Sequence, residues 1–76
     1  MEKKIETVSD FGEVVVTARK ASALRQVDAA YLIGVSPPVL NKLEQGKEVW
    51  LSKALDICKG LGIEIVLRFP DEAESS

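Results

Sequence analysis

The residues of this 76-residue chain offer hydrogen bonding rather than catalysis. Histidine is absent and the single cysteine is Cys58, so an internal disulfide is excluded and a zinc site would need carboxylate ligands almost alone. The sequence pairs no nucleophile with a base and contains no glycine-rich phosphate loop. We therefore expect no enzyme, no metal and no cofactor. The donor groups of amide and lysine side chains are the chemistry that remains.

Charge is distributed unevenly along the chain. The formal net charge is −2, yet seven cations and four anions lie between Val14 and Lys59, so this middle stretch carries +3. The acidic residues gather toward the two ends. A mildly basic centre between acidic ends is compatible with contacts to phosphates.

Two helices are predicted in the first half of the chain from apolar residues at spacings of three and four. The first spans about residues 10–22. Asp10 and Glu13 are interpreted as an acidic capping box, in which Asp10 accepts from first-turn N–H groups. The second spans about residues 26–33 and ends at Gly34, a residue suited to positive φ.

Two further helices are predicted in the second half. One spans about residues 37–45, with Ser36 as N-cap and prolines at its first positions, where they cost no hydrogen bond. The other spans about residues 50–60. The residues predicted to face the core are Phe11, Val15, Ala18, Ser22, Val27, Ala30, Ile33, Leu40, Leu43, Leu51, Ala54 (or Leu55), Cys58 and Leu61.

The apolar period changes to two over Ile63–Phe69, a strand pattern that ends at Pro70. A lone strand leaves its backbone donors unpaired, and a chain of this size buries only about 60% of its unfolded surface. We therefore expect this segment to pair antiparallel with a second copy in a two-fold homodimer. A local strand or an added helical turn is the alternative. The expected interface consists of Ile63, Ile65, Leu67 and Phe69.

The segment Ile33-Gly34-Val35-Ser36 joins the second and third predicted helices. The glycine permits a sharp turn, the aliphatic side chains hold the helices together, and the serine starts the next helix. This arrangement is typical of a helix-turn-helix, whose second helix presents its first turn to a DNA major groove.

The stretch Gln26–Lys47 resembles the lambda-repressor/Cro-like (XRE) helix-turn-helix family, whose pattern is roughly Q-x-x-L-A-x-x-x-G-V-S-x-x-x-[IL]-[SN]-x-[IL]-E-x-G. Residues 10–12, Arg19 and residues 61–65 extend the resemblance to the HipB-type antitoxin branch. The resemblance implies a mainly α, four-to-five-helix DNA-binding domain with a C-terminal β-strand that pairs across a homodimer. The predicted divisions are a flexible segment 1–8, a helix-turn-helix domain 9–62, a dimerisation strand 63–69 and a disordered tail 70–76.

The resemblance also implies roles for individual residues. Gln26 would contact a backbone phosphate, and Glu44 would tie the third helix to the following loop. Pro37, Pro38, Asn41 and Lys42 would face the groove. From side-chain chemistry we expect apolar contact with thymine methyl groups, Asn41 toward adenine, and Lys42 toward guanine or a phosphate. The full set of expected DNA contacts is Gln26, Ser36, Pro37, Pro38, Asn41, Lys42, Lys47 and Arg25.

Two departures from the family pattern affect these expectations. Ala29 replaces a larger aliphatic residue. Pro37 and Pro38 stand where relatives often carry glutamine, lysine or arginine, and a proline side chain has no donor or acceptor. We therefore expect modest base specificity, helped by dimer spacing and DNA shape.

Three functions fit the sequence. The first is a repressor that binds a palindromic operator in double-stranded DNA and acts as the antitoxin of a HipA-like kinase in an operon that it autoregulates. The second is a stand-alone phage or plasmid repressor. The third is a protein-interaction module that has lost DNA reading. Since no apolar run approaches the ~18 residues of a membrane span, we expect a cytoplasmic protein without membrane or small-molecule partners.

Overall fold

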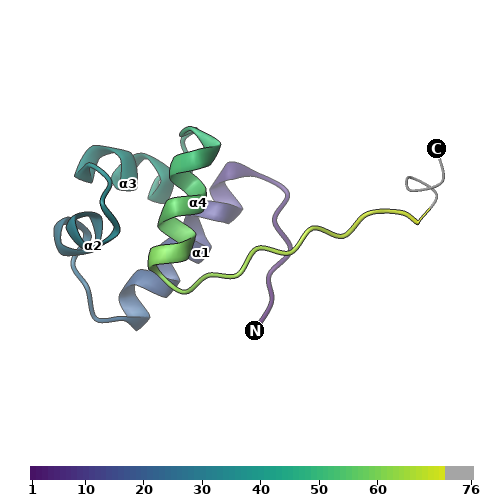
Figure 1. The fold of residues 1–76 in the computed structure, drawn as a ribbon, viewed down its shortest axis with the longest axis horizontal. Helices are drawn as coiled ribbons and strands as arrows, with labels where there is room; N and C mark the ends of the chain where they lie inside the picture. The colour runs from purple at the N-terminus through teal and green to yellow at the C-terminus, as the bar shows by residue number, and fades with distance from the viewer. Residues whose placement is uncertain (72–76) are drawn as a thin grey trace.

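Four helices form the body of the molecule, in a computed structural model that describes residues 1–71 (Figure 1). All four predicted helices are present, with bounds within two residues of the expected ones. They are α1 (Val8–Ala21), α2 (Gln26–Ile33), α3 (Pro37–Glu44) and α4 (Leu51–Gly60).

The chain leaves α4 as an extended segment that runs away from the helical body (Figure 1). No strand is found between residues 1 and 71, so the strand predicted over 63–69 has not formed in the single chain. The physical reason is that a strand needs a neighbour for its backbone groups. Most of the predicted disordered tail, residues 72–76, lies outside the described residues.

A capping box starts α1, but one turn earlier than the sequence predicted. Thr7 is the N-cap, and its Oγ1 accepts from the Asp10 N–H at 3.1 Å. The Asp10 carboxylate accepts from the N–H groups of Glu6 and Thr7 at 3.0 and 3.1 Å. The prediction that Asp10 and Glu13 form the box was wrong. Thr7 and Asp10 have the same three-residue spacing one turn earlier, and they form the box instead.

Removing the cap should lower stability. Thr7→Ala is expected to reduce the free energy of unfolding by about 1 kcal/mol, as measured by urea denaturation.

The hydrogen bond from the Glu6 N–H lowers the pKa of the Asp10 carboxyl. A depressed folded pKa adds stability above the unfolded value and loses it as pH falls through the folded pKa. Asp10→Asn should therefore have a lower free energy of unfolding than wild type at neutral pH, and this difference should shrink below about pH 4. A difference that does not change with pH would contradict this role of Asp10.

The core lies where all four helices meet. Val15, Leu40 and Ile57 are its largest fully buried side chains, as α1 packs on α3 and α2 packs on both α3 and α4. Burial raises the pKa of the Cys58 thiol, which fits its predicted place in the core. The residues that complete the core are Ala29, Ala30, Val35, Leu43, Ala54 and Cys58.

Three predicted core residues lie on the surface instead. Val27 is 53% exposed, Leu51 is 71% exposed, and Ser22 is exposed at the C-cap of α1. Val27 and Leu51 stand in the first turn of a short helix, where Ala30 and Ala54 three residues later take the inward face, so Ala54 rather than Leu55 is the buried alternative. No helix within residues 1–71 has the length and apolar character needed to cross a membrane.

The contact between α1 and α3 depends on a glycine. A Cβ at Gly12 would overlap the backbone oxygen of Leu43 and lie 3.0 Å from that of Glu44. The absence of a side chain there lets the end of α3 rest directly on α1. This close approach brings Arg19 of α1 within reach of Glu44.

Candidate nucleic-acid interface

Helices α2 and α3 are joined by a tight turn centred on Gly34. Gly34 has φ 90°, and its N–H donates to the Ala30 carbonyl at 2.9 Å, which ends α2 as predicted. Val35 is buried beside Gly34 and helps to hold α3 against α2. Two short packed helices with this turn define a helix-turn-helix.

The start of α3 has prolines at its first two positions. Ser36 occupies the N-cap position as predicted, but its side chain makes no capping hydrogen bond to any described residue, so that part of the prediction was wrong. The reason is that Pro37 and Pro38 have no N–H, and the N–H of Val39 donates to the Ser36 carbonyl at 3.0 Å. The Ser36 hydroxyl is thus left at the surface.

The outer face of α3 is open to solvent, opposite the buried Leu40 and Leu43. Pro37, Pro38 and Lys42 are exposed, and Asn41 is half-buried. Lys47 follows in an exposed loop. The structure therefore brings the predicted groove-facing residues onto one accessible surface of one helix.

A partly buried ion pair holds this helix against α1. The Arg19 guanidinium donates from Nε and Nη2 to the two oxygens of Glu44, at 2.6 and 2.9 Å. Its Nη1 donates to the Leu24 carbonyl at 2.9 Å. The side chains of Arg19 and Glu44 are only 13% and 6% exposed, and the hydrogen bond to Glu44 raises the pKa of Arg19.

The expected role of Glu44 therefore needs correction. Its carboxylate ties α3 to α1 through Arg19 and to the start of α2 through Gln26, whose Nε2 donates to Glu44 Oε1 at 3.1 Å. The described contacts of this side chain do not include the loop after α3. Arg19 was singled out in the sequence only through the family resemblance, and its separation of 25 residues from Glu44 gave no local signal.

Gln26 lies at the first position of α2 and faces α3. Besides Glu44, its Nε2 contacts the Asn41 Oδ1 at 3.3 Å. The side-chain amide nitrogen of Gln26, the residue expected to contact a phosphate, therefore donates within the protein. The neighbouring Arg25 is 81% exposed along its side chain, and its Nε donates to Asp28, which raises the pKa of Arg25.

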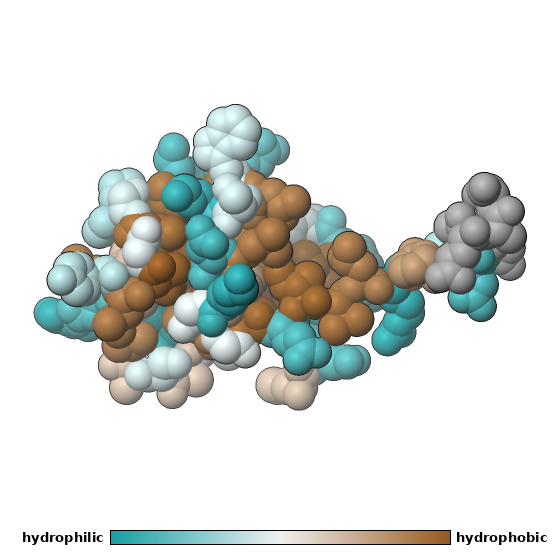
Figure 2. All heavy atoms as spheres, in the orientation of Figure 1, coloured by the Kyte–Doolittle hydropathy of each residue, from teal (hydrophilic) through white to brown (hydrophobic). Residues whose placement is uncertain are grey.

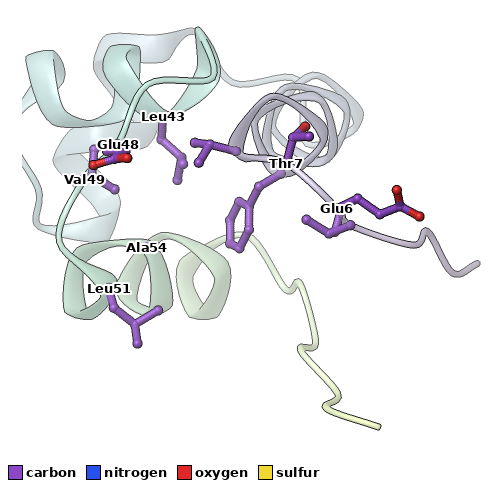
Figure 3. Close-up of a pocket in the computed structure, with 10 residues that line it drawn as sticks. Glu6, Thr7, Leu43, Glu48, Val49, Leu51 and Ala54 are labelled. Carbon is purple, nitrogen blue, oxygen red and sulfur yellow. The ribbon is translucent and has the colours of Figure 1, made fainter. Parts of the chain in front are cut away.

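The candidate dimer residues differ in exposure. Ile63 packs partly against the core, whereas Ile65, Leu67 and Phe69 are 42%, 83% and 60% exposed. Hydrophobic atoms continue from the helical body along the extended segment (Figure 2). A shallow apolar hollow lies between the start of α1 and α4 (Figure 3). Its apolar lining consists of Ile5, Val8, Phe11, Leu43, Val49, Leu51 and Ala54.

Comparison with known proteins agrees with this geometry. No family model matches the chain. The chain is 36% identical over 73 residues to the HTH-type transcriptional regulator y4mF of Sinorhizobium fredii (strain NBRC 101917 / NGR234). This match covers 95% of this chain and 96% of that protein. The chain therefore belongs to the HTH-type transcriptional regulators, in the lambda-repressor/Cro-like (XRE) helix-turn-helix family.

Solved structures share the fold. A complex of a HipB variant with an O2 20mer matches with a TM-score of 0.80 at 17% identity, over 93% of this chain and all of that one. A chain of a HipA–HipB–O2–O3 complex matches with a TM-score of 0.79 at 17% identity, over 92% of this chain and all of that one. The restriction-modification controller protein C.AhdI from Aeromonas hydrophila matches at 0.67 and 29%, over 75% and 84%. At 17% identity, the HipB likeness concerns the fold.

Proposed function

We propose that this regulator is a sequence-specific repressor that places α3 in the major groove of double-stranded DNA. The observation that carries the proposal is the exposed face of α3, which is held on α1 and α2 by the Arg19–Glu44–Gln26 contacts. HipB, which has this fold, is known from complexes with O2 and O4 20mers. Asn41 and Lys42 supply donors to the groove, and Pro37 and Pro38 supply apolar contacts such as those with thymine methyl groups.

The phosphate contacts are assigned mainly to α2 and the loop after α3. The first N–H groups of α2 are uncapped by any described side chain, whereas the first two positions of α3 have no N–H at all. A helix start with free N–H groups favours an anion. Gln26 would contact a phosphate through its backbone N–H, and Arg25, Ser36 and Lys47 would make further contacts to DNA.

The repressor acts as a homodimer in this proposal. Residues 9–62 would form the helix-turn-helix domain, and residues 63–69 would pair antiparallel with the same segment of a second copy, in line with the exposed side chains of Ile65, Leu67 and Phe69. The two-fold axis would set two copies of α3 about 34 Å apart, the spacing of successive major grooves on one side of a palindrome.

We also propose an antitoxin role, in which the dimer binds a HipA-like kinase and represses the operon that encodes both. The fold shared with a chain of the HipA–HipB–O2–O3 complex supports this role. Co-purification of the dimer with a kinase encoded beside it is the expected result. A regulator that binds its own promoter with no such neighbour would instead be a stand-alone repressor.

Lysine substitutions test the DNA proposal. Lys47→Ala should weaken binding to the protein's own promoter DNA uniformly across sequences. It should also reduce the slope of log affinity against log salt by about 1, because one phosphate is no longer neutralised. Fluorescence anisotropy at several salt concentrations measures both quantities. Lys59→Ala, in the last turn of α4, is the matched control and should leave the slope unchanged.

The same titration separates DNA reading from a protein-interaction module. Wild-type binding must fall steeply with salt, because phosphate contacts release counterions. Failure to bind promoter DNA at any salt concentration would favour the module, for which the two prolines of α3 are the motivation.

A further inference from the structure

We infer that Asn41 reads guanine rather than adenine, because a chain of hydrogen bonds engages Oδ1 of its side-chain amide and leaves the NH₂ group for a base. This inference rests on the proposed DNA-binding function and assigns a base to one residue of that site. This series of hydrogen bonds runs from Arg19 through Glu44 and Gln26 to Asn41. At each residue, the bond already made determines which atom of the next side chain donates and which accepts.

The first link is the ion pair. A guanidinium only donates, and a carboxylate paired with it only accepts. Arg19 engages both carboxylate oxygens of Glu44 and also the Leu24 carbonyl, so the carboxylate plane is fixed from the α1 side. Glu44 Oε1 remains able to accept a further hydrogen bond from the α2 side.

The second link fixes Gln26. Its amide nitrogen lies 3.1 Å from Glu44 Oε1, and the opposite orientation would place the amide oxygen against a carboxylate. The amide nitrogen must therefore face Glu44. That nitrogen carries two hydrogens, and the second points to Asn41 Oδ1 at 3.3 Å.

The third link fixes Asn41. Because Gln26 Nε2 is a donor, the Asn41 amide must present Oδ1 toward it. If the Asn41 amide were flipped, its NH₂ group would face the NH₂ group of Gln26. Gln45 Nε2 approaches the same oxygen at 3.5 Å from the other side. A carbonyl oxygen has two lone pairs, and both now have donors.

The consequence appears at the base edge. Two-pronged recognition of adenine by asparagine needs Oδ1 to accept from adenine N6 while Nδ2 donates to N7. In this chain Oδ1 already accepts from Gln26 and Gln45, so the Nδ2 donors are the groups left for a base. Guanine presents two neighbouring acceptors, N7 and O6, in the major groove and is the base that matches a donor-only group.

The test is a selection from random duplexes with wild-type protein, followed by anisotropy on the enriched sequence. We expect a guanine whose preference over adenine, about 5- to 10-fold, disappears in Asn41→Ala. Replacing that guanine by 7-deazaguanine should cost wild type about 5-fold and leave Asn41→Ala unaffected. Gln26→Met releases Asn41 Oδ1, so its binding to the adenine duplex should rise relative to guanine. Gln45→Met is the matched control and should keep the preference, because the shorter contact from Gln26 still holds Asn41 Oδ1 toward the protein.

The outcomes are separable. An Asn41-dependent adenine would overturn the inference while leaving the DNA-binding function intact. A uniform loss of affinity in Asn41→Ala, without a change in base preference, would make Asn41 a phosphate contact and also overturn it. If wild type enriches no sequence although its circular dichroism shows a folded helical protein, the proposed function itself fails.

Discussion

Arg19→Met is expected to lower the free energy of unfolding by about 3 kcal/mol, because it leaves the Glu44 carboxylate buried without its cation. Glu44 is 6% exposed at its side chain, so water cannot replace the missing donors. A 76-residue chain has a total stability of roughly 4–11 kcal/mol, and the melting temperature should fall by roughly 12–24 °C.

The measurement is thermal and urea denaturation at one fixed protomer concentration, since the stability of a dimer depends on concentration. Lys20→Met makes the same change at the next, exposed position of α1 and should stay within about 0.5 kcal/mol of wild type. Arg19→Met combined with Glu44→Met removes both charges and should recover most of the loss. Equal effects of Arg19→Met and Lys20→Met would mean that the ion pair contributes nothing.

Leu67→Asp is expected to convert the homodimer into monomers. Leu67 is 83% exposed in the single chain, so its replacement leaves the helical core untouched. In the paired segment, each dimer would lose two buried leucines at about 1.5–3 kcal/mol each, which raises the dimer dissociation constant by roughly 10²- to 10⁴-fold. Sedimentation equilibrium measures this change directly.

Val66→Asp is the matched control. Val66 is the neighbouring residue on the opposite face of an extended segment and is 70% exposed, so this variant should remain dimeric. Leu67→Asp should keep wild-type helical circular dichroism while binding palindromic DNA much more weakly, because each monomer engages only one half-site. A monomeric wild type, or equal disruption by both aspartates, would refute pairing through this face.

The two variants test two different contacts that would position α3 on DNA. The Arg19–Glu44 pair orients α3 within one chain, through a contact between residues 25 positions apart. The segment 63–69 would orient two copies of α3 relative to each other. A repressor of this size needs both, since each helix supplies few base contacts and Pro37 and Pro38 supply no hydrogen bond.

Local signals in the sequence determined the elements. The spacing of apolar residues predicted all four helices, Gly34 predicted the end of α2, and the prolines predicted the start of α3. Each of these features depends on the backbone preferences of a few neighbouring residues, so it can be predicted from a short stretch of sequence. The buried positions of Val15, Leu40 and Leu43 followed from the same periodicity.

Only the tertiary structure decided which groups meet. Val27 and Leu51 fit the predicted apolar faces yet lie on the surface, because packing of the other helices selects the inward residue in each first turn. Glu44 accepts hydrogen bonds from Arg19 and Gln26 rather than from the following loop, because Gly12 lets α3 approach α1. The direction of each hydrogen bond around Asn41 follows from that approach. The sequence alone therefore determined the helices and their turn, while contacts between distant residues determined the chemistry of the face that they present.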